Sequence, residues 1–297
     1  MPKIRRWLAV VLIGGWVGVC LPASAEEDDG LVVLAAGDIA VCNLPGDEAT
    51  AAILDEQVKQ HPNAIVLALG DTVYPDGTAE DFQNCYAPTW GRHKKRTYPT
   101  VGNHEYVTRG AQGYFDYFGF RAAPEGLSYY AVRKGDWLLI ALNSNIDGRI
   151  ESYQGEWLKK TLQDHPTTCA LAFWHHPLFS SHEQRDRPRD LGAFWQILYE
   201  AGAELVLNGH IHIYERFAPL TPDGKRDDPR GMIQFTVGTG GASLNKPPKR
   251  IDPRSEALFM ESWGVLKLTL FADRYTWEFL PTGGVTFRDS GEAKCHP

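Results

Sequence analysis

The sequence is short of positive charge, of sulfur and of long apolar runs. Its 297 residues include 30 Lys and Arg against 37 Asp and Glu, with five Cys and three Met. A shortage of basic residues argues against a nucleic-acid-binding surface, which depends on Lys and Arg. Beyond the first 25 residues, no apolar run is long enough to span a bilayer. With 43% hydrophobic residues and no internal repeat or evident linker, we expect one globular domain.

The first 25 residues have the layout of a secretory signal peptide. Three basic residues precede an apolar run from Trp7 to Leu21, and Pro-Ala-Ser-Ala then leads to an acidic stretch. The alternatives are a retained membrane anchor or a lipid-modified Cys20. Cleavage after Ala25 would leave 27 basic and 37 acidic residues, a formal net charge of −10. We expect residues 26–297 to form the mature domain, secreted or periplasmic, without a stable membrane anchor.

Four cysteines would remain after cleavage: Cys42, Cys85, Cys169 and Cys295. An even number of cysteines in an exported chain is compatible with two disulfides, and four cysteines allow three pairings. We favour Cys42 with Cys85, because both follow strands that we expect to lie side by side. Cys169 lies inside an apolar strand, so a buried free thiol is the alternative for that residue.

Apolar strands and amphipathic helices alternate along the first two thirds of the chain, and strands alone follow. This order favours an α/β fold with layered sheets flanked by helices. The expected strands span residues 31–36, 64–69, 98–101, 128–132, 137–142, 168–174, 204–207, 213–218, 232–237, 265–271 and 275–280. The expected helices span residues 47–60, 151–164 and 191–201, with 114–118 a helical segment or a packed loop. Residues 221–230 and 245–256 are expected to be mobile surface loops.

Five of the apolar strands end in a residue that can bind a metal ion. These residues are Asp38, Asp71, Asn103, His175 and the pair His210 and His212, and four of the five strand ends have glycine directly before the first such residue. A lone Gly-Asp is most often a turn, but the carboxyl ends of strands in an α/β sheet converge, so the joint pattern predicts a metal site. No cysteine stands at these ends, which argues against a zinc–thiolate or iron–sulfur site.

The stretch from Gly70 to Tyr74 gives that site its most specific chemistry. A carboxylate has two oxygens, so Asp71 is able to bridge two cations. Tyr74 follows three residues later. Its phenol would bind a strongly polarising cation as a phenolate, or would simply pack against its neighbours.

Three motifs resemble those of the purple acid phosphatases, a branch of the calcineurin-like metallophosphoesterase superfamily. They are Gly70-Asp-Thr-Val-Tyr74, Gly102-Asn-His-Glu105 and Gly209-His-Ile-His-Ile-Tyr-Glu-Arg216. The match covers nearly the whole mature chain in order. The resemblance implies two mixed β-sheets packed together and flanked by helices. One departure is length, because the larger plant-type members carry an additional N-terminal β-domain, whereas only a few residues separate the predicted signal peptide from the first strand here.

The resemblance also implies a site for two metal ions, Fe(III) and a divalent ion of iron, zinc or manganese. Asp38, Asp71, Tyr74 and His212 would bind the ferric ion, and Asp71, Asn103, His175 and His210 the divalent ion. His104 would contact the phosphate or protonate the leaving oxygen. His182 is either a second such histidine or an ordinary loop residue. Glu105, His176 and Tyr214 are expected to orient the ligands rather than bind metal, with a solvent-facing position the alternative for His176.

These residues predict a secreted phosphatase that hydrolyses phosphate monoesters of small molecules by attack of metal-bound hydroxide. The Tyr74 phenolate would offset the additional charge of a ferric ion. The site would then have the same net charge with a ferric–divalent pair and the phenolate as with two divalent ions and no phenolate. One alternative is a phosphodiesterase or nucleotide-cleaving enzyme on the same scaffold. The other is a secreted protein that binds metal or phosphate without turnover.

Overall fold

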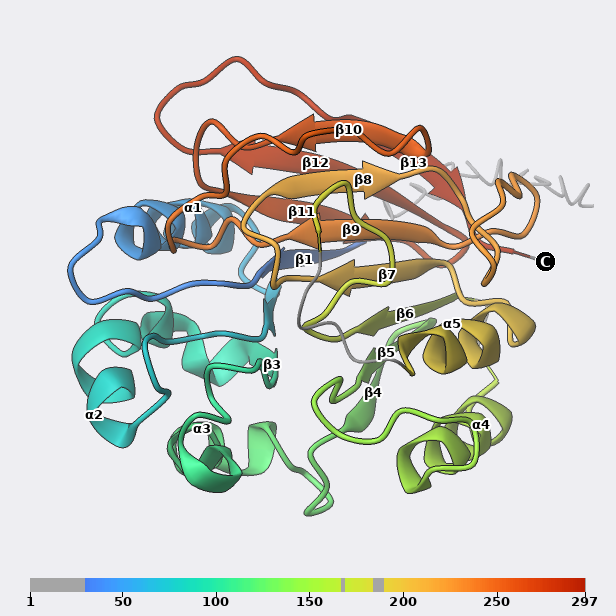
Figure 1. The fold of residues 1–297 in the computed structure, drawn as a ribbon, viewed down its shortest axis with the longest axis horizontal. Coiled ribbons are helices and arrows are strands. Elements are labelled where there is room, and N and C mark those ends of the chain that lie inside the picture. The colour runs from blue at the N-terminus through green and yellow to red at the C-terminus, as the bar shows by residue number, and fades with distance from the viewer. Residues whose placement is uncertain (1–29, 167–168, 184–189, 297) are drawn as a thin grey trace, which may run out of the picture.

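Two mixed β-sheets pack face to face, and helices cover them on the outside (Figure 1). The computed structural model describes residues 30–166, 169–183 and 190–296. The predicted signal peptide lies outside the described residues. The predicted fold class, two mixed sheets flanked by helices, is confirmed.

The first sheet has six strands in the order β13-β12-β11-β1-β2-β3. Three of them run parallel: β1 (Leu31–Ala36), β2 (Ile65–Leu69) and β3 (Thr97–Thr100). The other three continue the sheet in antiparallel fashion from β1: β11 (Gly264–Leu270), β12 (Arg274–Pro281) and β13 (Ser290–Lys294). Because β1 and β2 are parallel neighbours, their carboxyl ends lie at the same edge of the sheet.

The second sheet has seven strands in the order β10-β8-β9-β7-β6-β5-β4. A parallel set forms its centre: β5 (Trp137–Ala141), β6 (Cys169–Phe173), β7 (Leu205–Asn208) and β9 (Ile233–Val237). Antiparallel strands flank this set: β4 (Tyr130–Lys134), β8 (Tyr214–Phe217) and β10 (Ser255–Phe259). A hairpin joins β4 to β5.

Successive side chains of the central strands point to opposite faces of the sheet, and this divides the core into two parts. In β5, Leu139 joins the core that is shared with the first sheet, whereas Leu138 and Ile140 face the helices α4 (Tyr153–Asp164) and α5 (Leu191–Glu200). A strand buried on both faces reads as a continuous apolar run, because every side chain meets a packed layer. The helices α1 (Gly46–Gln60) and α3 (Gln112–Phe118) pack near the first sheet, with short helical turns between β2 and β3.

Strands β10 and β13 are absent from the predicted set. The side chains of β13 alternate between exposed and half-exposed, and most of those of β10 are also partly exposed, so neither has an apolar pattern. Strand β10 begins at Ser255, inside the range 245–256 that was expected to be loop. The segment 114–118 is helical, and the connection between β2 and β3 contains helical turns from Ala79 to Arg96. Such edge strands and turns depend on neighbours that are distant in the sequence.

The four cysteines of the described residues form two disulfides. The predicted Cys42–Cys85 bridge is confirmed, and Cys85 lies in a helical turn. The alternative of a free thiol at Cys169 is wrong, because this residue pairs with Cys295 and thereby ties the C-terminal segment to β6. Among the described residues, no helix combines the length and apolar character needed to cross a membrane.

Glu204, beside the C-terminal segment, is the basis of a stability prediction. Its buried carboxyl accepts a hydrogen bond from the backbone N–H of His296 at 2.8 Å. Burial raises the pKa of Glu204 to about 8 from an ordinary value of 4.5. Between these two values the folded state holds a proton that the unfolded state has released, so the stability of the wild-type protein falls as the pH rises through this window.

Glu204→Gln should therefore stabilise the protein at alkaline pH. The amide keeps an acceptor for His296 and carries no charge, so we expect equal stability near pH 4.5 and a gain on the order of 5 kcal/mol above pH 8. Urea unfolding of both proteins at the two pH values measures the difference. Glu125→Gln, at an exposed carboxyl, serves as the control and should change little. An equal effect of Glu204→Gln at both pH values would contradict the prediction.

Candidate metal centre

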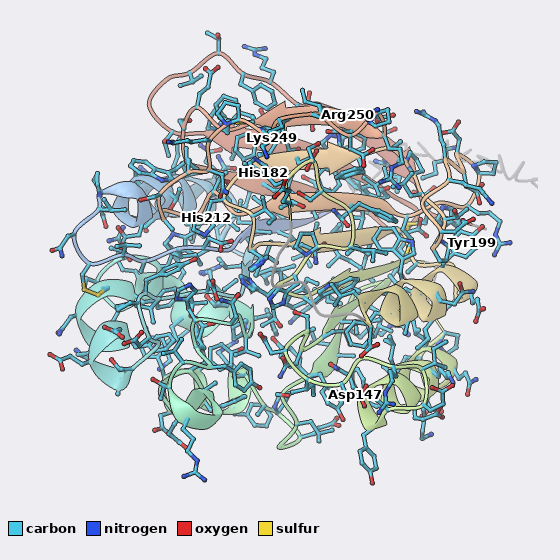
Figure 2. The ribbon with its side chains drawn as sticks, viewed as in Figure 1. Asp147, His182, Tyr199, His212, Lys249 and Arg250 are labelled. Atoms are coloured by element: carbon cyan, nitrogen blue, oxygen red, sulfur yellow. A yellow bond between two sulfur atoms is a disulfide. The ribbon has the colours of Figure 1, made fainter. Side chains whose placement is uncertain are left out.

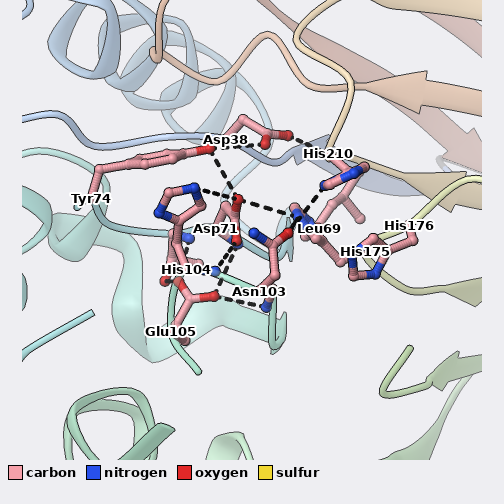
Figure 3. A network of polar contacts seen from close by, with 12 residues as sticks. Asp38, Leu69, Asp71, Tyr74, Asn103, His104, Glu105, His175, His176 and His210 are labelled. Carbon is pink, nitrogen blue, oxygen red and sulfur yellow. Dashed lines mark hydrogen bonds and ion pairs between the residues drawn. The ribbon is translucent and has the colours of Figure 1, made fainter. Parts of the chain in front are cut away.

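The ends of five strands from both sheets meet at one place (Figure 3). Asp38, Asp71 and Asn103 follow β1, β2 and β3 of the first sheet. His175 follows β6, and His210 follows β7 of the second sheet. One ligand atom from each of Asp38, Asp71 and His175 lies within 4.8 Å of the others. The structure thus brings together the residues that the strand-end pattern singled out.

One group of four donor atoms is formed by the Tyr74 hydroxyl and three atoms around it. This oxygen lies 3.0 Å from Asp38 Oδ1, 3.1 Å from Asp71 Oδ2 and 3.2 Å from His212 Nε2. His212 Nε2 is also 3.2 Å from Asp38 Oδ1. These are the four side chains predicted to bind a ferric ion, and Tyr74 lies among them rather than packing elsewhere.

A second group of donor atoms surrounds the side-chain oxygen of Asn103. Asn103 Oδ1 lies 3.1 Å from His175 Nε2 and 3.1 Å from His210 Nδ1. His175 Nε2 is in turn 3.3 Å from Asp71 Oδ2. The same Asp71 oxygen therefore faces both groups, as a bridging carboxylate requires.

The spacing of these atoms fits metal binding. Nitrogen and oxygen ligands lie about 2.1 Å from a transition-metal ion, so two neighbouring ligands of one ion are about 3 Å apart. The separations of 3.0–3.3 Å in both groups match that spacing. The set of carboxylate, phenol, amide and imidazole donors suits iron, zinc or manganese. The residues present therefore fit two ions that share Asp71.

Backbone carbonyls fix which nitrogen of two histidines faces the centre. His175 Nδ1 donates to the carbonyl of Leu69 at 2.9 Å, and His212 Nδ1 donates to the carbonyl of Ser243 at 2.7 Å. Because a carbonyl only accepts, Nδ1 of each ring carries a proton, and Nε2 is the nitrogen that a metal ion would bind in place of a proton.

Glu105 holds the loop that carries Asp71. Its buried carboxylate accepts hydrogen bonds from the backbone N–H of Asp71 at 3.0 Å, of Thr72 at 2.6 Å and of Gly102 at 2.7 Å. Since both oxygens are occupied by backbone donors, Glu105 fixes the loops of β2 and β3 to each other. This contact pattern agrees with an orienting role for Glu105.

A family model described as calcineurin-like phosphoesterase matches residues 31–214, which include all the donor residues above. The chain belongs to this family. Among its relatives, purple acid phosphatase 15 of Arabidopsis thaliana is 28% identical over 213 residues, covering 60% of this chain and 40% of the relative. The calcineurin-like superfamily predicted from the motifs is confirmed, and the curated relative is a purple acid phosphatase, as the motifs suggested.

Solved structures agree with the fold. A purple acid phosphatase isolated from yellow lupin (Lupinus luteus) seeds superimposes with a TM-score of 0.70 at 18% identity, covering 91% of this chain and 55% of that chain. GAP50, the anchor in the inner membrane complex of Plasmodium, gives a TM-score of 0.62 at 14% identity, covering 90% and 88%. At these identities the likeness concerns the fold alone. The chain spans 40% of the length of the first curated relatives that it matches.

Backbone strain is concentrated at three of the candidate ligand residues. Asp38, Asp71 and His210 have positive φ angles of 58°, 46° and 69°, a region that residues with a side chain rarely adopt. Within the described residues only Ala111 shares this feature among the non-glycine residues. Strain of this kind persists where the surrounding structure enforces it, and it is typical of functional sites.

The electrostatics of the centre favour cations. Burial opposes charge on Asp71, but the positive charges of His175 and His104 outweigh it and hold the pKa of the carboxyl below its usual range. Burial would likewise lower the pKa of His175, yet the Asp71 carboxylate raises it to about 9, and Asp38 raises that of His212 to about 9. Burial and the same two carboxylates raise the pKa of the Tyr74 phenol well above 10. A phenolate at Tyr74 therefore requires a bound cation.

His104 lies at the open side of the centre. Its Nδ1 donates to the carbonyl of Pro75 at 2.6 Å, and its Nε2 lies 4.0 Å from Asp71 Oδ2. Its ring contacts that of Tyr74, with the centroids 4.4 Å apart, and about a third of its side chain is exposed. Nε2 thus points toward the donor atoms without belonging to either group, as expected of a residue that contacts substrate.

Two residues that were expected to orient the ligands, His176 and Tyr214, have different surroundings in the structure. His176 is buried with its Nδ1 2.8 Å from Ser144 Oγ, and its ring lies against that of His210, so the solvent-facing alternative is wrong. Tyr214 donates to Asp289 at 2.6 Å and stacks on Phe279, so its hydroxyl points away from the donor groups and no described contact supports an orienting role. The reason is that its strand, β8, places successive side chains on opposite faces.

His182 is joined to the donor residues by no contact among the described residues. It follows Ser181 in the loop after β6, and its Nε2 is buried without a hydrogen-bond partner. The structure therefore leaves its catalytic role a prediction. The sequence also gave no signal for the carbonyls of Leu69 and Ser243, because every residue carries a carbonyl. Ser144, the partner of His176, was not predicted for the same reason: a serine alone is too common to indicate a site.

Gly102 provides a test of the packing around Asp71. A Cβ atom at this position would lie 2.1 Å from Asp71 Oδ1 and 2.2 Å from the Asp71 backbone nitrogen. Gly102→Ala removes no ligand, yet it must displace the bridging carboxylate. We expect the metal content of the purified variant to fall well below that of the wild type, and any phosphoesterase activity to fall with it. Gly192→Ala is the control, because a Cβ there would meet no atom within 4 Å. Full metal content in Gly102→Ala would show that the centre adapts.

Proposed function

We propose that this chain is a dinuclear metal phosphoesterase that hydrolyses phosphate monoesters of small molecules. The observation that supports this most directly is the position of Asp71 Oδ2, at 3.1 Å from the Tyr74 hydroxyl and 3.3 Å from His175 Nε2, between two groups of metal-binding side chains. Membership in the calcineurin-like phosphoesterase family and similarity to purple acid phosphatases point to the same reaction.

We propose roles for the side chains as follows. Asp38, Tyr74 and His212 hold one ion, Asn103, His175 and His210 hold the other, and Asp71 is shared. When bound, the two ions would supply the charge that holds the phosphate oxygens and lowers the pKa of a water molecule. His104, with Nδ1 donating to Pro75, directs Nε2 toward the substrate, where it would bind a phosphate oxygen or give a proton to the departing alcohol.

The remaining assignments belong to the same proposal. We propose Fe(III) in the Tyr74 position and a divalent iron, zinc or manganese ion in the other. We also propose export, with cleavage after Ala25 and residues 26–297 as the mature domain. Two disulfides support an oxidising compartment, secreted or periplasmic.

Comparison of two substrates separates the proposal from its nearest alternative. The metal-loaded protein should hydrolyse 4-nitrophenyl phosphate with a kcat/KM at least about tenfold above that for bis(4-nitrophenyl) phosphate, a diester. The reverse order would indicate a phosphodiesterase on the same fold. Binding of both metals without hydrolysis of any phosphoester would indicate a binding protein.

Tyr74→Phe tests the identity of the first ion. A phenolate bound to Fe(III) produces a visible charge-transfer band, so we expect the metal-loaded wild type to be coloured and the variant to lose this band. Tyr106→Phe is the control, because its hydroxyl instead accepts a hydrogen bond from Asn143 at 2.8 Å. An absorption spectrum with metal analysis gives the result. An unchanged band in Tyr74→Phe would exclude Tyr74 as the source of the colour.

A further inference from the structure

A loop with three cations is tethered to the metal centre at its first end. The loop spans residues 245–252, with Lys246, Lys249 and Arg250 as its cations, and we call it the cationic loop. Asn245 donates its N–H to the carbonyl of His212 at 3.0 Å, and its side-chain oxygen accepts the N–H of His212 at 2.9 Å. Lys246 therefore follows directly after a residue that is bonded on both sides to a proposed metal ligand.

Ser181 and Glu215 fix the other end of the cationic loop. Glu215 lies three residues after His212 in β8, is buried, and accepts hydrogen bonds from both the hydroxyl and the N–H of Ser181, the latter at 3.0 Å. The Ser181 hydroxyl oxygen in turn accepts the N–H of Asp252 at 2.9 Å. One buried carboxylate thus holds the end of the cationic loop together with the segment that carries His182.

Two cations of the loop, Lys249 and Arg250, lie on the same part of the molecule as His182. Figure 2 shows Lys249 beside His182, with Arg250 on one side of this pair and His212 farther away on the other. The contacts agree with this view, because Lys249 Nζ lies 3.5 Å from a carboxylate oxygen of Glu183, the residue after His182.

These cations are available to a ligand. The ion pair of Lys249 with Glu183 is open to solvent, with the Lys249 side chain 93% exposed, and no ion pair with a described residue involves Lys246 or Arg250. The acid at the end of the loop, Asp252, is already paired with Arg254 at 2.6 Å. Pro247 and Pro248 restrict the backbone between the cations, which lowers the entropy lost on ordering the loop.

We propose that the cationic loop binds a second anionic group of the substrate, so that the site favours phosphoesters that carry another phosphate or a carboxylate. This inference rests on the proposed function, because the reacting phosphate would occupy the metal centre. Lys246, at the tethered end, and Lys249, beside Glu183, would meet charge that lies several ångströms from the reacting phosphorus. The chain as a whole is acidic, with a formal charge of −7, so a local cluster of cations is needed to attract such a substrate.

The experiment compares the triple variant Lys246→Ala/Lys249→Ala/Arg250→Ala with the metal-loaded wild type. The substrates are phenyl phosphate and 4-carboxyphenyl phosphate, which differ by one carboxylate. We expect kcat/KM for phenyl phosphate to change less than twofold, and the preference for the carboxylated ester to fall about tenfold, the sum of three exposed charge contacts. Added salt should reduce the preference of the wild type as well.

A charge-matched control removes three lysines elsewhere. Lys59→Ala/Lys159→Ala/Lys160→Ala changes the net charge by the same amount on α1 and α4, and it should leave the preference unchanged. Ser181→Ala keeps all three cations and removes the hydroxyl that holds Asp252, so we expect part of the same loss of preference. An unchanged preference in the loop variant, or an equal loss for both esters, would overturn the inference.

Equilibrium binding separates failure of this inference from failure of the proposed function. Phosphate and pyrophosphate are titrated into the metal-loaded wild type and the loop variant, and no turnover of an ester is needed. We expect the ratio of the two affinities to fall about tenfold in the variant. If the affinity ratio falls but the protein hydrolyses no ester, the proposed role of the cationic loop is supported and the proposed function is contradicted. Hydrolysis with an unchanged ratio would uphold the function and contradict the loop.

Discussion

Asp71→Ala is expected to abolish phosphoester hydrolysis and to remove metal from the protein. Asp71 Oδ2 is the oxygen that faces both groups of donor atoms, at 3.1 Å from the Tyr74 hydroxyl and 3.3 Å from His175 Nε2. The variant loses the shared ligand and one of the negative charges that hold two cations together. We expect kcat to fall by about 10³-fold or more, because both ions contribute to the charge that stabilises the transition state.

Metal analysis of purified Asp71→Ala beside its turnover distinguishes this explanation from unfolding. Asp116→Ala removes an exposed carboxylate from α3 and is the matched control, with metal content and turnover expected to match the wild type. A folded Asp71→Ala protein with two ions per chain and substantial activity would contradict the bridging role. Thermal unfolding of both variants in the presence of metal shows whether the fold is retained.

His104→Ala is expected to lower kcat by about 10²–10⁴-fold while the metal content stays at the wild-type level. The substitution keeps the backbone N–H of residue 104, which donates to Asp71 Oδ1 at 2.9 Å, so the bridging carboxylate stays in place. It removes Nε2, which lies 4.0 Å from Asp71 Oδ2 and points into the open side of the centre.

The leaving group decides which of two roles His104 performs. If its imidazole protonates the departing oxygen, the loss of rate should be larger for phenyl phosphate than for 4-nitrophenyl phosphate, whose leaving group needs less help. If the imidazole only binds the phosphate, both substrates should lose rate equally. His165→Ala, at an exposed histidine after α4, is the control. Loss of metal from His104→Ala would instead make the residue structural.

Local sequence patterns were sufficient to predict where most of the fold lies. Strand β1 was predicted over its whole length. Strand β2 was predicted to within one residue at both ends, and β6 to within one residue at its C-terminal end. Strands buried on both faces are easy to predict because they read as continuous apolar runs. Strand β13 was missed for the opposite reason, since its half-exposed residues have no apolar pattern. Its position depends on hydrogen bonds to β12, which the sequence does not display.

The donor residues were predictable because each one follows a strand directly. Asp38 and Asp71 come from neighbouring parallel strands, so the sheet alone places their carboxylates at one edge. His175 and His210 come from neighbouring parallel strands of the other sheet in the same way. The sequence supported Tyr74 as a donor residue less strongly, because a tyrosine three residues beyond a ligand is also able to pack against its neighbours. Only the folded chain brings its hydroxyl to 3.0 Å from Asp38 Oδ1.

The sequence by itself determined the family, the order of most strands and helices, and the set of residues available for a metal centre. These follow from local rules: apolar periodicity, glycine at sharp turns, and side chains that have few other uses at a strand end. Tertiary structure alone decided the direction of Tyr214, the pairing of Cys169 with Cys295, and the carbonyls that orient His175 and His212. It also decided that the cationic loop is held to His212 and, through Ser181, to Glu215. Each of these joins residues far apart in the sequence, and such contacts form only when both sheets are packed.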